Sequence, residues 1–160
     1  MKKIILGIDP GIADTGFGLI EVNGLDLKFI DCGVIKTEAK LDLADRLVIL
    51  YKDLNLLIKK YQPDLVAIEE LYFNKNTKTA LIVGQARGVV LLSLKLKKIP
   101  LIGLTPSQVK QAVCAYGKAP KKQVQTMVKK ILKLKNIPQP DDAADALATA
   151  IGAAGLNYVK

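Results

Sequence analysis

Short apolar runs alternate with longer amphipathic stretches along the chain. Residues 4–8 and 65–69 form apolar runs that finish at or beside a carboxylate, which is typical of buried strands that end at a turn. Residues 16–22 and 27–35 also favour extended structure, and Asn23-Gly24 between them is the strongest short signal for a hairpin. The pattern therefore predicts an antiparallel meander of three strands at the start of the chain.

The period changes to that of a helix over residues 41–60, where apolar side chains recur at helical spacing with charged residues between them. A helix that leads from the third strand to the strand at 65–69 is typical of a parallel α/β connection. The other predicted elements are a loop or a frayed helix start at 72–78, a helix at 79–96, a strand at 101–104, a helix that opens at 105–107, a loop at 116–120, and helices at 121–134 and 141–156. This order predicts one mixed-sheet α/β domain over residues 1–160.

Length and composition support a single soluble domain. The chain has 160 residues, of which 50% are hydrophobic, enough for a real core. Its two cysteines, Cys32 and Cys114, follow no regular spacing, so we expect reduced thiols. The first apolar run is too short for a signal peptide, and no charge-free apolar stretch of about 18 residues supports a membrane span. We therefore expect a cytoplasmic protein that does not bind membranes.

Charge is distributed very unevenly along the chain. The net charge is +9, but the first 70 residues carry 9 basic and 12 acidic side chains, whereas the rest carry 15 basic and 3 acidic. No carboxylate occurs between residues 71 and 140. Because lysine and arginine attract a phosphate backbone whatever its sequence, this asymmetry favours a nucleic acid as partner. A solvated basic surface without a partner is the alternative.

Acidic residues at three places in the chain carry the candidate chemistry. Asp9 and Glu69 stand where two buried strands end, and ligands of α/β sheets gather at the carboxyl ends of parallel strands. Asp142 and Asp145 are three residues apart on the last predicted helix, so they share one face. Capping and the helix dipole also favour acids in a first turn, which would account for Asp141 and Asp142 but not for Asp145.

This set offers oxygen ligands alone, because the chain contains no histidine. The absence of histidine excludes histidine-based triads and zinc–histidine sites. Oxygen ligands suit Mg²⁺ or Mn²⁺, and two such ions about 4 Å apart activate water and stabilise the leaving oxygen of a phosphodiester. The sequence thus indicates metal-assisted phosphodiester hydrolysis, and ordinary strand-end acids in water are the alternative.

Six motifs, in order over almost the whole chain, resemble those of a known family. They are Gly7-Ile8-Asp9-Pro10-Gly11 with Thr15-Gly16, Ile68-Glu69-Glu70-Leu71-Tyr72-Phe73, Gly84-Gln85-Ala86-Arg87-Gly88, Val109-Lys110-Gln111-Ala112-Val113, Lys122-Gln123-Val124-Gln125-Thr126-Met127-Val128 and Asp142-Ala143-Ala144-Asp145-Ala146-Leu147. In this order and spacing they resemble RuvC, the family of bacterial Holliday-junction resolvases. The resemblance implies an RNase H-like fold, with a five-stranded mixed sheet in which strands 1 to 3 are antiparallel and strands 1, 4 and 5 parallel, flanked by helices.

The resemblance also implies an activity and its catalytic residues. It implies a homodimeric, Mg²⁺-dependent endodeoxyribonuclease that nicks two opposing strands of a four-way DNA junction in recombination and repair, with a branch-migration helicase complex as partner. The catalytic and metal-binding acids match Asp9, Glu69, Asp142 and Asp145, which would hold two Mg²⁺ ions per site, with Mn²⁺ as a substitute. Some members of the family have histidine where this chain has Asp142.

Further residues are candidates for contacts with DNA or with a second copy of the chain. Tyr72, Lys110 and Lys121 match family positions associated with junction DNA, and solvated lysines or core packing of the aromatic ring are the alternatives. The other candidate DNA contacts are Phe73, Lys75, Lys78, Lys118 and Lys122. Gly84 and Gly88 share a face of the helix at 79–96, which the resemblance suggests is the dimer contact; packing against the chain's own sheet is the alternative.

Two other classes of function stay open on the sequence. Asp9-Pro10-Gly11 followed by a hairpin is similar to the phosphate-binding turn of actin-like and sugar-kinase-like ATP-binding modules. Those proteins need two related domains around the nucleotide, whereas 160 residues make one. A non-catalytic DNA-binding protein would account for the basic half of the chain, but not for acids at a surface that meets phosphate.

Overall fold

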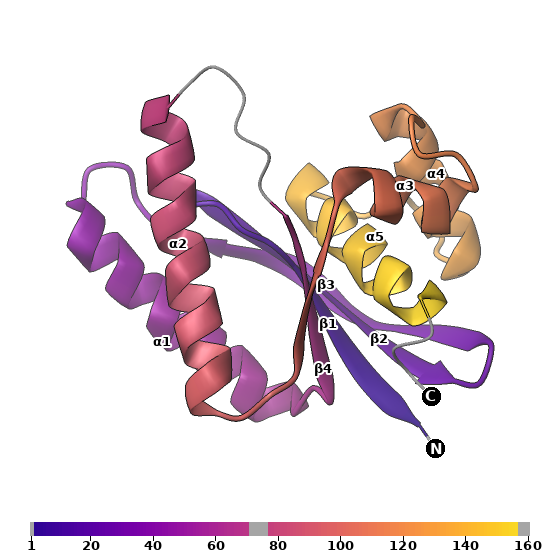
Figure 1. Ribbon diagram of the computed structural model, residues 1–160, viewed down its shortest axis with the longest axis horizontal. Coiled ribbons are helices and arrows are strands. Elements are labelled where there is room, and N and C mark those ends of the chain that lie inside the picture. Colours follow the sequence, from indigo (N-terminus) through magenta and orange to yellow (C-terminus); the bar gives the residue numbers. More distant parts are fainter. Residues whose placement is uncertain (1, 71–76, 157–160) are drawn as a thin grey trace.

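A five-stranded mixed sheet lies between two layers of helices in the computed structural model, which describes residues 2–70 and 77–156 (Figure 1). The strands are β1 (Lys3–Asp9), β2 (Asp14–Asn23), β3 (Asp26–Lys36), β4 (Leu65–Glu69) and β5 (Leu101–Leu104). They are ordered β3-β2-β1-β4-β5, with β1 to β3 antiparallel and β1, β4 and β5 parallel. The predicted meander and mixed sheet are confirmed.

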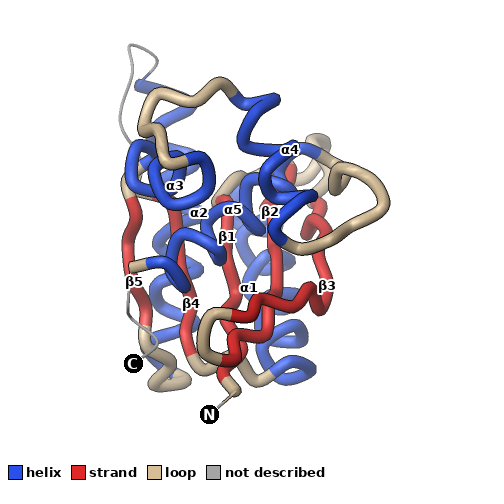
Figure 2. Tube along the Cα trace, turned by 90° about the vertical axis from the view of Figure 1, so that its right-hand side faces the viewer, coloured by secondary structure: helices blue, strands red, loops and turns tan. Residues whose placement is uncertain are grey.

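Two helices cover one face of the sheet and three cover the other (Figure 1). The first layer consists of α1 (Leu43–Tyr61) and α2 (Thr77–Leu96), and the second of α3 (Pro106–Cys114), α4 (Lys121–Ile131) and α5 (Asp141–Gly155). Figure 2 shows α3 and α4 near the end of the sheet at which the three parallel strands finish. This is the end at which the sequence predicts a functional site.

The helix boundaries differ from the prediction at five ends. Helix α1 begins at Leu43, two residues after its predicted start, and ends at Tyr61, one residue after its predicted end. Thr105 caps α3 in a reciprocal capping box with Gln108, as the predicted helix opening requires. Helix α2 begins at Thr77, two residues before its predicted start. Helix α4 ends at Ile131 rather than at residue 134, because the backbone reaches the left-handed region at Lys133, with φ of 53°. Helix α5 ends at Gly155, one residue before its predicted end.

The alternation of side chains along each strand decides which residues face the second helix layer. On β1, Leu6 and Ile8 are buried against α1 and α2, whereas Ile5 lies in the core on the α5 side. Asp9 follows Ile5 by two periods of the strand and so lies on the α5 side as well. On β4 the same alternation places Ala67, and with it Glu69, on the α5 side. The two strand-end carboxylates therefore share a face and an edge.

Helix α5 packs unusually close to the sheet. A Cβ atom added to Gly7 would overlap the backbone of Ala146, and one added to Gly16 would overlap the backbone of Asp142. Ten residues of α5 are buried, and most of them are alanine. Small residues on both surfaces thus bring the first turns of α5 against the ends of β1 and β2, as the alanine-rich sequence predicts. Overpacking such a contact typically costs about 1–3 kcal/mol.

Part of α2 is long and apolar enough, by length and composition alone, to cross a membrane. It covers Thr79–Leu96 and is the one such helix among residues 2–70 and 77–156. The stretch includes Arg87 and Lys95, so the expectation that no charge-free apolar run of this length occurs still holds. One such helix is weak evidence of a span, and Ala86 and Val90 of α2 are fully buried against the sheet layer.

Candidate active site

Four predicted carboxylates meet at one end of the sheet. Asp9 ends β1 and Glu69 ends β4, while Asp142 and Asp145 come from the first two turns of α5. Gly16 is the cross-strand partner of Asp9 on β2 and also the point where the backbone of Asp142 touches the sheet. The parallel pairing of β1 with β4 and the close packing of α5 therefore bring residues 60 to 136 positions apart in the chain into one acidic cluster.

The pKa of Asp9 is the most perturbed in this cluster. It is raised from 3.8 to about 7, and burial is the largest cause. Repulsion from Asp145, Glu69 and Asp142 adds to the effect, and the positive charge of Lys121 opposes it. A carboxyl whose pKa is raised by burial and by three neighbouring carboxylates is a candidate ligand for a divalent metal ion.

The pKa values of Glu69 and Asp145 are raised as well. Burial raises the pKa of Glu69, repulsion from Asp145 raises it further, and Lys110 and Lys121 oppose the shift. Burial also raises the pKa of Asp145, against the hydrogen bond and the charge of Lys121. Two lysines therefore offset only part of the negative charge that the fold collects at this edge.

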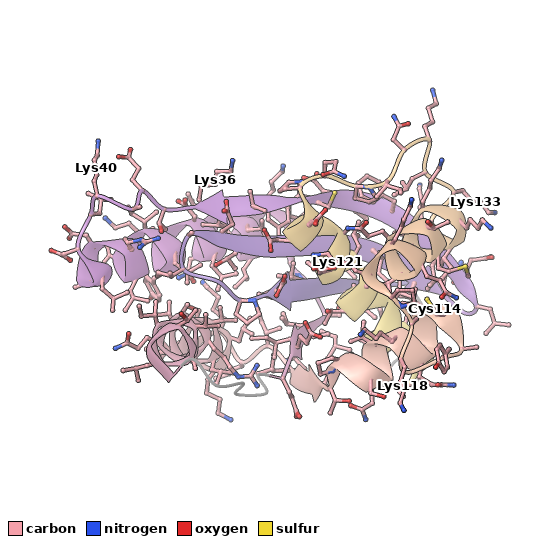
Figure 3. The ribbon with its side chains drawn as sticks, turned by 90° about the horizontal axis from the view of Figure 1, so that it is seen from above. Lys36, Lys40, Cys114, Lys118, Lys121 and Lys133 are labelled. Atoms are coloured by element: carbon pink, nitrogen blue, oxygen red, sulfur yellow. The ribbon has the colours of Figure 1, made fainter. Side chains whose placement is uncertain are left out.

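Lys121 is the basic residue that reaches into the acidic cluster. Its Nζ atom lies 3.0 Å from Asp145 Oδ2 and 3.3 Å from Asp141 Oδ2. Partial burial disfavours its charge, but the hydrogen bonds and attraction to Asp145 and Asp141 outweigh this and raise the pKa of Lys121. Figure 3 shows Lys121 beside the first turns of α5. The alternative that Lys121 is a solvated lysine without contacts does not fit these two ion pairs.

The adjacent acids Asp141 and Asp142 have different surroundings. Asp141 pairs with Lys121 and accepts a hydrogen bond of 3.0 Å from Gln125 Nε2, so α4 holds it on the outer side of the cluster. Asp142 repels Asp9 and lies against Gly16. This supports the motif-based choice of Asp142. Capping explains neither acid, because the N-cap of α5 is Pro140 and no side chain caps the helix.

A cavity of about 220 Å³ opens beside the cluster. Glu69, Lys110, Lys121 and Asp145 line it together with apolar residues of α3, α4 and α5. Lys110 thus comes from α3 to the same space that Lys121 reaches from α4. A cavity that both carboxylates and lysines line suits a phosphodiester that approaches together with a cation.

The four carboxylates are ligands that fit a hard divalent metal ion, although they do not form a complete coordination site as they stand. All four carboxylates offer oxygen, and repulsion from the other three contributes, after burial, to the raised pKa of Asp9. Among residues 2–70 and 77–156, no three acidic or sulfur ligands stand close enough together to hold an ion as they are.

The remaining predicted contacts fall into three groups. Tyr72, Phe73 and Lys75 lie outside the described residues, and Lys78 lies on the first turn of α2. Lys122 is exposed at the start of α4, and Lys118 is exposed on the α3–α4 loop, at the outer edge of this region (Figure 3). Gly84 and Gly88 touch nothing within 4 Å of an added Cβ, so packing against the chain's own sheet is not their role.

Two polar contacts at the site are missing from the predicted set. Arg87 of α2 donates a hydrogen bond of 2.9 Å to the backbone oxygen of Glu69, and Gln125 donates to Asp141. Both residues lie within motifs that the sequence analysis singled out, but neither the spacing nor the residue type indicates what they touch. Each contact joins elements whose proximity depends on the tertiary fold.

Stability in the absence of metal is expected to fall as pH rises through about 7. Between the unfolded pKa of 3.8 and the folded value near 7, the folded state keeps a proton on Asp9 that the unfolded chain has lost. This contribution is complete below the unfolded value and is lost above the folded one. Each kcal/mol of change in the free energy of unfolding shifts Tm by about 2–4 °C in a chain of this size.

The measurement is Tm from pH 5 to 8 in a chelator, for the native chain and for Asp9→Asn. The native chain should lose several degrees relative to the variant, whose amide has no proton to release, because the other acids titrate in both. Parallel curves would mean that Asp9 does not titrate in this range.

Comparison with known proteins finds close relatives over nearly the whole chain. The family model described as crossover junction endodeoxyribonuclease RuvC matches residues 5–153. The enzyme of that name from Desulforamulus reducens is 57% identical over 148 residues, which are 92% of this chain and 91% of the relative. That from Halothermothrix orenii is 53% identical over 148 residues, 92% of this chain and 90% of the relative.

Solved structures are also similar to this chain over nearly its whole length. Thermus thermophilus RuvC in complex with Holliday junction substrate has a TM-score of 0.91 and 34% identity, and the match covers 96% of this chain and 94% of that one. The yeast mitochondrial Holliday junction resolvase has a TM-score of 0.64 and 19% identity, and the match covers 92% of this chain and 77% of the yeast chain. The second similarity concerns the fold alone, which is RNase H-like, as predicted.

Proposed function

The chain belongs to the RuvC family of crossover junction endodeoxyribonucleases, and from this premise we propose that it resolves four-way DNA junctions by two symmetric phosphodiester cuts. The observation that carries the proposal is the cluster of Asp9, Glu69, Asp142 and Asp145 at the carboxyl end of the parallel strands, with the pKa of Asp9 raised to about 7. A non-catalytic DNA-binding protein has no use for buried acids beside a phosphate site, so this alternative is not favoured. An actin-like ATP-binding module is not favoured either, because the family match covers residues 5–153.

The same four carboxylates would hold Mg²⁺, and we propose two ions per site with Mn²⁺ as a substitute. When bound, these ions supply a hydroxide nucleophile and stabilise the leaving oxygen. The protein contributes a buried, negatively charged set of oxygen ligands on two strand ends and one helix, which are rigid supports. Asp9 would release its proton to solvent on metal binding, because a nearby positive charge would stabilise its carboxylate.

The two lysines at the cavity would orient the phosphate that is cut. Lys110 and Lys121 approach the carboxylates from α3 and α4, and both charges act on Glu69. Lys121 now pairs with Asp145 and Asp141, and an entering phosphate would compete for its ammonium group. Lys121 also begins α4, where free backbone N–H groups favour an anion.

A wider DNA surface would extend from this cavity. Lys118 and Lys122 are exposed on the α3–α4 side, and Lys78 lies on the first turn of α2. We propose that they contact phosphates, together with Lys75 of the intervening segment. Tyr72, with Phe73 as the second candidate, would stack on a base at the opened junction.

An apolar stripe on α2 supports a homodimer. Leu81, Leu92 and Leu96 are 66%, 56% and 65% exposed, and Gly88 lies on the same face with open space above it. Large apolar side chains at positions 11 and 15 residues apart form one continuous strip of a helix, and such strips usually mark an interface. A two-fold axis through this helix would also give two active sites for two symmetric cuts.

Replacing Leu92 with lysine is therefore expected to separate the dimer. A buried hot-spot residue contributes about 2 kcal/mol or more, so the dissociation constant should rise at least about 30-fold. Leu25→Lys is the matched control, because Leu25 is fully exposed at the turn between β2 and β3. Sedimentation equilibrium measures both. Leu25→Lys should stay dimeric, and a Leu92→Lys chain that also stays dimeric would place the interface elsewhere.

The proposed activity is tested with a synthetic four-way junction and a linear duplex of matched sequence, each incubated with Mg²⁺. We expect cuts at symmetric positions on two opposing strands of the junction and none on the duplex. Equal cutting of both substrates, or binding without cutting, would contradict the proposal. Two further properties are proposed from the family alone: a branch-migration helicase complex as partner and a cytoplasmic location.

A further inference from the structure

Arg87 holds the backbone of a catalytic acid from the opposite face of the sheet. Its guanidinium donates a hydrogen bond of 2.9 Å to the carbonyl oxygen of Glu69. Arg87 belongs to α2, whereas the Glu69 side chain points to the α5 side, so the contact reaches the main chain without entering the catalytic cavity. Among the described residues no carboxylate forms an ion pair with Arg87.

Within the described residues, no backbone N–H group of the sheet is in position to donate a hydrogen bond to the Glu69 carbonyl oxygen. The N–H groups of Val66 and Glu70 donate to β5, at 2.9 Å to Pro100 and 2.7 Å to Leu104, so the peptide groups of β4 alternate and Glu69 faces β1. Ile8 lies opposite Ile68, and continuing this parallel register places the next N–H for Glu69 at residue 10.

Residue 10 is proline, which has no N–H to donate. The ladder between β1 and β4 therefore ends one hydrogen bond short, directly beside Asp9. Arg87 supplies the donor that Pro10 lacks. Without Arg87, the Glu69 carbonyl would have no hydrogen-bond donor in the described part of the chain, and the last peptide group of β4 would be held only through the Glu70 N–H, which donates to Leu104.

The composition of the chain supports a specific role for this guanidinium. Only two of its 24 basic residues are arginines, Arg46 and Arg87. Arg46 donates through Nε to Thr37 at 2.9 Å and so ties α1 to the end of β3. Lysine supplies almost all of the positive charge, and arginine occurs at two places where a directed donor joins a helix to the sheet.

We propose that Arg87 is a positioning residue for Glu69: it replaces the hydrogen bond that Pro10 removes and so fixes the orientation of the catalytic carboxylate. The proposal rests on the proposed function, in which Glu69 is a metal ligand. Because Arg87 lies one residue from Gly88, on the helix that carries the apolar stripe, the contact also connects the proposed dimer helix to the active site.

The test compares Arg87→Ala, Arg87→Lys, Glu69→Gln and the control Arg46→Ala in the full-length protein. Single-turnover cleavage of a bound junction should fall about 10- to 100-fold in Arg87→Ala, since small misplacements of catalytic groups cost that much. Junction affinity in Ca²⁺ should change less than about threefold, because Arg87 is outside the cavity. Arg87→Lys should recover part of the rate, and ethylguanidinium should rescue Arg87→Ala where an equal concentration of NaCl does not.

A second readout does not depend on cleavage. The rise in Tm on addition of Mn²⁺ should be smaller in Arg87→Ala than in the native chain, whereas Arg46→Ala should keep the full rise even if its metal-free Tm is lower. The proposal is overturned if Glu69→Gln is inactive while Arg87→Ala cleaves at the native rate, or if Arg46→Ala loses cleavage and the Mn²⁺ response equally. Cleavage by Glu69→Gln at the native rate would instead reject Glu69 as a metal ligand, and a native chain that cleaves no junction would reject the proposed function itself.

Discussion

Replacing Asp9 with asparagine is expected to lower the rate of junction cleavage at least about 10³-fold, while the chain still binds the junction. Asp9 lies at the centre of the acidic cluster, where burial and three neighbouring carboxylates raise its pKa to about 7. The amide keeps the size of the side chain but removes its negative charge, so it binds a divalent cation poorly. The cleavage rate in Mg²⁺ and the junction affinity in Ca²⁺ measure the two effects separately.

Asp31→Asn is a suitable control for this variant. Asp31 lies on β3 and accepts hydrogen bonds from Tyr61 and from the backbone of Cys32, so its loss tests a polar substitution in the same sheet but outside the acidic cluster. We expect cleavage by Asp31→Asn at a rate close to that of the native chain. Native-rate cleavage by Asp9→Asn would remove Asp9 from the metal site, whereas loss of junction binding by this variant would mean that the substitution disturbs the fold.

The strands and most helices could be predicted because their signals are local. The turn at Asn23-Gly24, the capping box at Thr105 and the apolar run that ends at Glu69 each act within a few residues, and the structure confirms all three. The early end of α4 could not be predicted in this way. No glycine marks it, and a lysine takes the left-handed conformation while Leu132 packs into the core.

In the candidate site, too, the residues with local signals could be predicted, whereas contacts that depend on the tertiary fold could not. Carboxylates at strand ends can be found in sequence because the edge of a parallel sheet gathers them, and the alanines around Asp145 indicate a buried helix. The contact of Arg87 with the Glu69 carbonyl depends on the packing of α2 and on a register between β1 and β4, which are more than 50 residues apart. No local pattern contains that information.

Replacing Lys121 with alanine is expected to lower cleavage about 10²-fold and to weaken junction binding with a shallower salt dependence. Its ammonium lies 3.0 Å from the Asp145 carboxylate and 3.3 Å from that of Asp141. If Lys121 contacts a phosphate, the slope of log affinity against log salt should decrease by about 1. Cleavage rates and a salt titration of binding measure the two quantities.

Lys130→Ala is the matched control, because Lys130 is exposed near the far end of the same helix. The two lysines have the same charge and the same helical support, so long-range attraction of DNA should change alike in both variants. A loss of cleavage confined to Lys121→Ala therefore reports its place beside Asp145 rather than its contribution to net charge. Equal losses in the two variants would mean that Lys121 acts only as part of a general basic surface, and the assignment of Lys121 to the catalytic cavity would be wrong.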